Sequence, residues 1–243
     1  MNTSVQAVTT VGLVYAFIPA AVVVVILFRW CATGWSAIYA LTRMLIQLLL
    51  VGFILVYIFA AENAWIILAV LAVMMLAASW ISIRPVREKT PAMYRNAGIA
   101  VLLGGGLTLL LVSQLVLSLQ PWYLPRYVIP LAGMIFAGSM NAISLAAERY
   151  EAERHRAVTD SEARAIALQA SLIPMTNALL AVGLVSLPGM MTGQILSGVS
   201  PFIAAKYQII VMCMMYGSSG MSAAIYLTLS KRTIVGAPSR RDR

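Results

Sequence analysis

The sequence predicts an all-α, polytopic transmembrane helix bundle of about seven spans, with the N-terminus outside and the C-terminus in the cytosol. The first reason is composition, because 61% of the 243 residues are hydrophobic and only 10% are charged, whereas a soluble domain carries about 25% charged residues. The second is that apolar runs of about 20 residues, the length that spans a bilayer, recur along the chain. The third is that basic residues gather in alternate connections, as the positive-inside rule requires. The formal charge of +9 therefore indicates orientation in a membrane, and we expect no nucleic acid partner.

Polar, basic or turn-forming residues end each apolar run and set the limits of the predicted spans. A basic loop from Arg84 to Arg95 follows the third run, and an aromatic, proline-rich stretch from Gln120 to Tyr127 precedes the fifth and suits the headgroup layer. The predicted spans are Val8–Phe28, Ser36–Ala60, Trp65–Ile83, Ala97–Leu119, Tyr127–Ala147, Ile173–Leu196 and Tyr207–Leu229. We expect residues 1–232 to form a single transmembrane domain and residues 233–243 to form a basic, disordered cytosolic tail.

Residues 148–171, which we call the coupling segment, are the only long polar run of the chain, and the orientation places them in the cytosol. Their first part has oppositely charged residues three or four apart, which are neighbours on a helix surface and predict a solvated helix. These pairs are Arg149/Glu153, Glu151/Arg154 and Glu153/Arg156.

The second part of the coupling segment predicts a new, amphipathic helix. Thr159 and Glu162 have the spacing of a capping box, which marks a helix start. Pro174 predicts a break or kink before the next apolar run. Such a helix beneath a membrane bundle suits docking to a partner, and a solvated connector that contacts nothing is the alternative. The apolar residues that recur along one face are Ala163, Ile166, Ala167 and Ala170.

Catalytic groups are missing from the predicted spans. No Asp or Glu lies well inside a span, and the single histidine, His155, is in the coupling segment. Proton relays, buried carboxylate metal sites and membrane enzymes need such groups at membrane depth. The sequence also has no GxxxxGK[ST] stretch, so we expect no ATPase site in this chain. We therefore assign no catalytic residue and no metal ligand, and we expect the chain to be no enzyme.

Two features inside the predicted spans are candidates for a translocation path. Arg43 is the one charge within a span, with Gln47 a turn further along the same face. Such a residue faces the bundle interior or a cavity, or else its side chain reaches the nearby interface. Pro188 and Gly189 predict a broken sixth span, and broken spans mark transport sites, although a kink with tight packing explains them equally well. Further candidates in this run are Met190, Met191, Thr192, Gly193 and Gln194, and in the fifth span Gly133, Met134, Ser139 and Asn141.

Three stretches of the sequence resemble the FetB-like family of ABC-transporter permeases, described as iron exporters with plant relatives linked to aluminium tolerance. They are Arg43–Leu55 (RMLIQLLLVGFIL), Val128–Ile135 (VIPLAGMI) and Gly183–Ile209 (GLVSLPGMMTGQILSGVSPFIAAKYQI), and the last is the most specific. The resemblance covers most of the chain from the second span onward. The sequence departs from the family in a shorter coupling segment and in Ala137-Gly138, where relatives often have Gly-Asn.

The resemblance implies a permease of a bacterial inner membrane that works as two copies with two copies of a separate cytosolic ATPase. ATP would bind to that partner, and this chain would hold no cofactor. Glu162-Ala163, which precede Ile173-Pro174, look like the coupling loop of ABC permeases. The family implies export of iron or another metal. A non-metal solute such as a nucleotide-sugar or lipid-like molecule, and a stand-alone channel or secondary carrier, are the alternatives. The residues expected to contact the ATPase are Thr159, Glu162, Ala163, Arg164, Ile166, Ala167 and Ala170.

Overall fold

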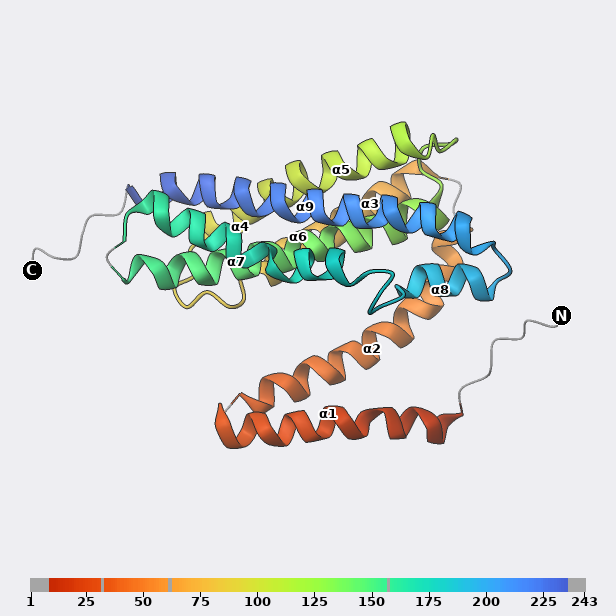
Figure 1. Cartoon of the computed structure of the whole chain (residues 1–243), viewed down its shortest axis with the longest axis horizontal. Coiled ribbons are helices and arrows are strands. Elements are labelled where there is room, and N and C mark those ends of the chain that lie inside the picture. The colour runs from red at the N-terminus through yellow and green to blue at the C-terminus, as the bar shows by residue number, and fades with distance from the viewer. Residues whose placement is uncertain (1–8, 32, 61–62, 157, 236–243) are drawn as a thin grey trace, which may run out of the picture. The chain divides into compact units, whose positions relative to one another are not determined.

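The computed structural model describes residues 9–31, 33–60, 63–156 and 158–235, and its account of side chains ends at Ser230. Nearly all of these residues are helical, and none of them forms a strand (Figure 1). Within the described part, six helical stretches are long and apolar enough to cross a bilayer. The elements are α1 Thr10–Trp30, α2 Gly34–Phe59, α3 Ala64–Ser82, α4 Pro91–Ala100, the π-helical η1 Val101–Gly106, α5 Leu107–Leu110, the π-helical η2 Leu111–Val116, α6 Pro125–Arg154, α7 Asp160–Ala181, α8 Gly189–Leu196 and α9 Pro201–Val235.

The contacts of the chain fall into two compact units, residues 1–61 and residues 62–243, which are described separately. In the first unit, the α1–α2 turn is fixed by the edge-to-face rings of Phe28 and Trp35, 5.6 Å apart. Gly34 is needed there, because a Cβ would lie 2.4 Å from the Phe28 ring. The expectation of one domain over residues 1–232 stays a prediction, and residues 236–243 of the expected tail lie outside the described residues.

In the second unit, α6 and α9 pack closely along small residues. A Cβ on Gly104 of η1 would lie 2.3 Å from Ser222 Oγ and 2.7 Å from its backbone nitrogen, so η1 approaches α9 only because this residue is glycine. The Ser222 hydroxyl donates to Ser139 Oγ at 3.0 Å, and Ser139 Oγ donates to the Ser218 carbonyl at 3.4 Å. Polar side chains thus join helices inside an apolar bundle, where no water competes for them.

The predicted fourth span is confirmed as one helical rod, Pro91–Val116. It starts earlier than expected, because Pro91 occupies the first turn of α4, where proline costs no hydrogen bond. Two π-helical turns interrupt it, and the first contains the glycine run 104–106. The Thr108 hydroxyl donates to the Gly104 carbonyl at 2.6 Å.

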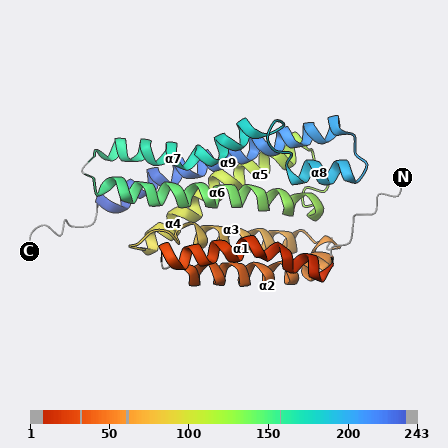
Figure 2. The same ribbon diagram turned by 60° about the horizontal axis from the view of Figure 1, so that its bottom comes forward.

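The predicted sixth span is not one helix, and of the break or kink expected at Pro174 the break is wrong. Helix α7 continues through Pro174 to Ala181, since an internal proline removes only one backbone donor and α7 packs against α6 and α9. The chain breaks instead between Val182 and Pro188, after which α8 begins, as expected, at Gly189. Gly183 adopts φ +84, a conformation that favours glycine. Figures 1 and 2 show α7 and α8 following one another along the bundle.

Candidate functional site

The end of the second unit that carries the coupling segment is called the polar end. Helix α6 extends past its expected limit into this segment and reaches Arg154. The expected ion pairs of Glu153 are confirmed, with Arg149 at 2.6 Å and with Arg156 at 3.3 Å, and Glu153 itself is buried. The expected Glu151–Arg154 pair is not among the described ion pairs. Arg154 instead lies over the Tyr150 ring, 5.8 Å from its centroid.

The expected start of α7 is confirmed. Thr159 is the N-cap, and its Oγ1 accepts a hydrogen bond from the Glu162 N–H at 3.3 Å. Asp160 forms an ion pair with Arg164 at 3.2 Å, and its Oδ1 accepts a hydrogen bond from the Tyr150 hydroxyl of α6. The acidic first turn also suits the positive N-terminal end of the helix dipole. The start of α7 is therefore held firmly against the end of α6.

The expected apolar face of α7 packs inward. Ala163 and Ala167 are fully buried, while Ile166 and Ala170 are half-buried, as is Arg164. Ala163 and Ala167 therefore act as packing residues, and they leave the outer surface of α7 to its polar side. The exposed residues of this part of α7, which we call the outer face of α7, are Ser161, Glu162, Ala165 and Gln169.

The candidates in α2 lie in the first unit. Arg43 is half-buried and Gln47 is exposed. Neither side chain forms a hydrogen bond or an ion pair with another described residue. The alternatives for Arg43, a site facing the bundle and a side chain reaching the interface, both stay open.

The candidates in α6 are not gathered on one surface. Gly133 and Met134 are half-buried, and Gly133 faces α3, because a Cβ there would lie 3.6 Å from Met74 Cε. Ser139 is completely buried in the contact with α9, whereas Asn141 is exposed. Ser139 therefore joins helices in this structure, and the sequence pattern grouped residues that point in different directions.

The candidates around α8 lie at the edge of the bundle. Pro188 is the N-cap of α8, and Met190 is exposed, whereas Met191 and Thr192 are half-buried. A Cβ on Gly189 or on Gly193 would meet nothing within 4 Å, so no described helix lies close against either glycine.

Two glutamines at this end of the bundle have a buried side-chain oxygen that lacks a partner. Gln194 Oε1 in α8 and Gln208 Oε1 in α9 are buried without a hydrogen-bond donor among the described residues. Gln208 was missed by the sequence analysis, because a single polar residue near the start of an apolar run looks like an interface residue. None of the predicted path residues lines any of the three cavities that follow.

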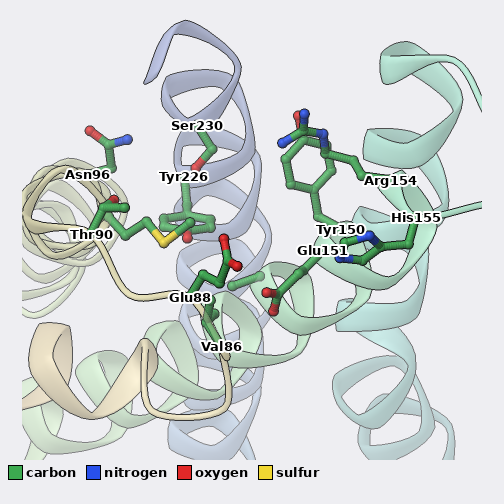
Figure 3. A pocket seen from close by; sticks show the side chains of 12 residues that line it. Val86, Glu88, Thr90, Asn96, Tyr150, Glu151, Arg154, His155, Tyr226 and Ser230 are labelled. Atoms are coloured by element: carbon green, nitrogen blue, oxygen red, sulfur yellow. The ribbon is translucent and has the colours of Figure 1, made fainter. Parts of the chain in front are cut away.

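A cavity of about 340 Å³, which we call the polar-end pocket, opens beside the coupling segment (Figure 3). It lies between the α3–α4 loop, α4, and the last turns of α6 and α9. Sequence reasoning did not find it, because its walls come from stretches that are far apart along the chain. Its lining residues are Val86, Glu88, Thr90, Met93, Asn96, Ala147, Tyr150, Glu151, Arg154, His155, Tyr226 and Ser230.

Two further cavities differ from the polar-end pocket in chemistry. One of about 400 Å³ lies between α3, the fourth span and α6, and its only polar side chains besides Trp122 are Ser113 and Gln114. Its position and apolar lining suit lipid chains. The other, of about 280 Å³, adjoins the polar-end pocket and is lined by Pro85, Arg87, Glu148, Glu151, Ala152 and His155.

Comparison with known proteins places the chain in a family. A family model described as "Uncharacterised protein family (UPF0014)" matches residues 8–235. A UPF0014 membrane protein of Synechocystis is 38% identical over 187 residues, covering 70% of this chain and 71% of that protein. The "Probable iron export permease protein FetB" of Escherichia coli is 34% identical over 211 residues, covering 80% of each chain. "Protein ALUMINUM SENSITIVE 3" of Arabidopsis thaliana is 34% identical over 204 residues, covering 76% of this chain and 72% of that protein.

No solved structure matches the chain. The family matches confirm the resemblance inferred from Arg43–Leu55, Val128–Ile135 and Gly183–Ile209. The described helices agree with a protein that crosses the bilayer several times. The chain is therefore a multi-pass helical membrane protein that belongs to the UPF0014 family.

Proposed function

We propose that this chain is the membrane-spanning permease subunit of an ABC transporter, and that it exports iron or another metal cation from the cytosol. The family and the printed name of the Escherichia coli relative, an iron export permease, support this proposal. In this account the polar end faces the cytosol of a bacterium, and the bundle lies in the inner membrane. Two copies of the chain assemble with a separate ATPase, which binds the ATP.

The observation that carries the proposal is the continuity of α7. This helix starts outside the apolar region, presents Glu162 and its outer face to solvent, and runs unbroken for 22 residues into the bundle. At 1.5 Å per residue it is about 33 Å long. A rigid helix of that length transmits a push at its start to its far end. The far end meets the irregular stretch from Val182 to Pro188, where Gly183 provides a bend.

The mechanism follows from this arrangement. Closure of the ATPase on ATP moves the outer face of α7, and α7 carries the movement along α6 and α9, against which it packs. The break between α7 and α8 absorbs the displacement, because its backbone is not held in a helical ladder. The chain itself supplies no catalytic step, so ATP hydrolysis takes place entirely on the partner.

A co-purification experiment tests the docking. The tagged chain is expressed with a candidate ABC ATPase, and the complex is purified in a mild detergent. Glu162→Arg reverses an exposed charge on the outer face of α7, and we expect it to abolish recovery of the ATPase. Lys206→Glu is the matched control, because it reverses an exposed charge near the start of α9. Recovery that is equal in the parent and in both variants contradicts docking on α7.

A further inference from the structure

The polar-end pocket contains two carboxylates that have no ion-pair partner among the described residues. Glu88 comes from the α3–α4 loop and Glu151 from α6, and neither forms an ion pair with any described residue. Glu151 Oε2 accepts one hydrogen bond, from the backbone N–H of Arg87 at 3.3 Å. Figure 3 shows the two side chains facing the same space from opposite walls. In a chain with a formal charge of +9, an unneutralised acidic pair in one cavity favours a positively charged occupant.

Two nitrogen-bearing side chains of the pocket, Arg154 and His155, do not fill this role. The Arg154 guanidinium lies over the Tyr150 ring, with 5.8 Å to the ring centroid, and its side chain is exposed. His155 is also exposed, at the end of α6. Both are therefore open to solvent, and neither forms an ion pair with Glu88 or Glu151 among the described contacts.

A buried hydroxyl independently points to a ligand. Ser230 lines the pocket from α9 and is only 3% exposed, yet its Oγ has no hydrogen-bond partner. Tyr226, one turn earlier, interacts with Ser230 through a side-chain hydrogen bond, but this contact lies outside the geometry that would satisfy Ser230 Oγ. A buried polar atom without a partner is rare in a folded protein. A bound group in the pocket would supply the missing partner.

The donor set decides which cation fits. Among the described residues no three His, Cys, Asp or Glu side chains are placed to hold one metal ion together, which disfavours a dehydrated ion in a complete protein cage. Carboxylate and hydroxyl oxygens suit hard divalent cations. Ions of this type keep several waters and bind through one or two carboxylates. A volume of about 340 Å³ leaves room for those waters.

We propose that the polar-end pocket binds a partly hydrated divalent cation, with Glu88 and Glu151 supplying the charge and Ser230 a neutral oxygen. The proposal rests on the proposed function in one respect, since it gives an exported metal cation a place to enter from the cytosol. The site also adjoins the coupling segment. Tyr150, which lines the pocket, donates a hydrogen bond to Asp160, the first residue of α7. A cation that draws Glu151 toward Glu88 pulls on α6 beside Tyr150, and the hydrogen bond from Tyr150 to Asp160 links α6 to α7.

Binding of Mn²⁺ to the purified full-length chain, without any ATPase, tests the site. The paramagnetic resonance signal of free Mn²⁺ is titrated against the protein in detergent, and we expect one saturable site. Glu88→Gln and Glu151→Gln should each weaken binding about tenfold or more, and Ser230→Ala should weaken it less, because it removes an uncharged oxygen. Glu148→Gln is the matched control, because it removes the same charge from α6 one turn earlier, outside the lining of the pocket. It should change the affinity less than about twofold.

Three outcomes would overturn the proposal. The first is a folded parent chain, monodisperse with an unchanged melting temperature, that binds no Mn²⁺. The second is equal weakening by Glu88→Gln and Glu148→Gln, which indicates a diffuse charge effect. The third is a chain that binds spermidine at this pocket and ignores Mn²⁺, which assigns the site to organic cations. Because no ATPase is present, Mn²⁺ binding with failed co-purification would refute the permease proposal while leaving the cation site intact.

Discussion

The hydroxyl of Tyr150 donates a hydrogen bond to Oδ1 of Asp160, and this contact ties the last turns of α6 to the first residue of α7. Tyr150 is buried, and it also forms part of the wall of the polar-end pocket. One side chain thus contacts both the proposed cation site and the helix that the ATPase is proposed to move. Substitutions at and around this contact distinguish the role of the polar-end pocket from the role of α7.

Tyr150→Phe should weaken the attachment of α7 while leaving the pocket nearly unchanged in shape. A hydrogen bond to a charged acceptor contributes about 1.5–3 kcal/mol, and we expect a loss toward the lower figure because Asp160 is partly exposed and keeps Arg164. Thermal unfolding in detergent measures the change, and hydrogen exchange should rise at residues 160–164. Tyr94→Phe is the control, since Tyr94 is half-buried and has no described hydrogen bond. Equal destabilisation by both variants would argue against the contact.

Ala167→Glu and Glu162→Arg should fail in different ways. Ala167 is fully buried, and an unpaired charge placed there costs several kcal/mol. This variant should lose expression and melting temperature together. Glu162 is exposed, so Glu162→Arg should keep the melting temperature of the parent and lose only the ATPase. A stable Ala167→Glu chain that still binds the ATPase would contradict the packing of α7.

Gly104→Ala should loosen the centre of the second unit. Its Cβ would lie 2.3 Å from Ser222 Oγ and 2.9 Å from Ser222 Cα, so α9 has to move. Overpacking of this kind costs about 1–3 kcal/mol. Gly217→Ala is the matched control on α9, because a Cβ there meets nothing within 4 Å. Melting temperatures of the two variants in the same detergent check the difference, and a normal value for Gly104→Ala would show that η1 and α9 are further apart.

Gly183→Ala should stiffen or distort the break between α7 and α8. Gly183 has φ +84, a conformation that costs other residues about 1–2 kcal/mol. Gly189→Ala is the control, since it adds the same methyl group where nothing lies within 4 Å and φ is not positive. If the break absorbs the movement of α7, Gly183→Ala should lower ATP-driven transport and leave ATPase binding intact. Equal transport by both variants would remove Gly183 from the mechanism.

Most of the fold was predictable from the sequence, because apolar length and helix capping are local properties. The first five spans and the seventh were placed within several residues, and Thr159 was identified as the start of a helix. Pro174 was misjudged because proline opposes helices by local rules, whereas packing along α6 and α9 stabilises α7 through that residue. Tertiary contacts of this kind leave no mark on the sequence nearby.

The polar-end pocket was not predictable, because it is a property of three-dimensional arrangement. Glu88, Glu151 and Ser230 are far apart in the chain, and each looks like an ordinary residue of a loop or helix end. The predicted path residues were chosen by being small or polar, and this criterion does not distinguish Ser139, which joins two helices, from Asn141, which is exposed. The two roles differ in how deeply the side chain is buried and in the direction in which it points. Both depend on which helix packs against each face of α6.

Transport of ⁵⁴Mn²⁺ in proteoliposomes tests the central claim most directly. The chain is reconstituted with the ATPase that co-purifies with it, and the transporters whose polar end faces outward are energised by external ATP. The account predicts accumulation inside the vesicles that requires ATP and both proteins, and that disappears with Glu162→Arg. Movement of Mn²⁺ by the chain alone, at the same rate with and without ATP, would contradict the account and indicate a channel or secondary carrier.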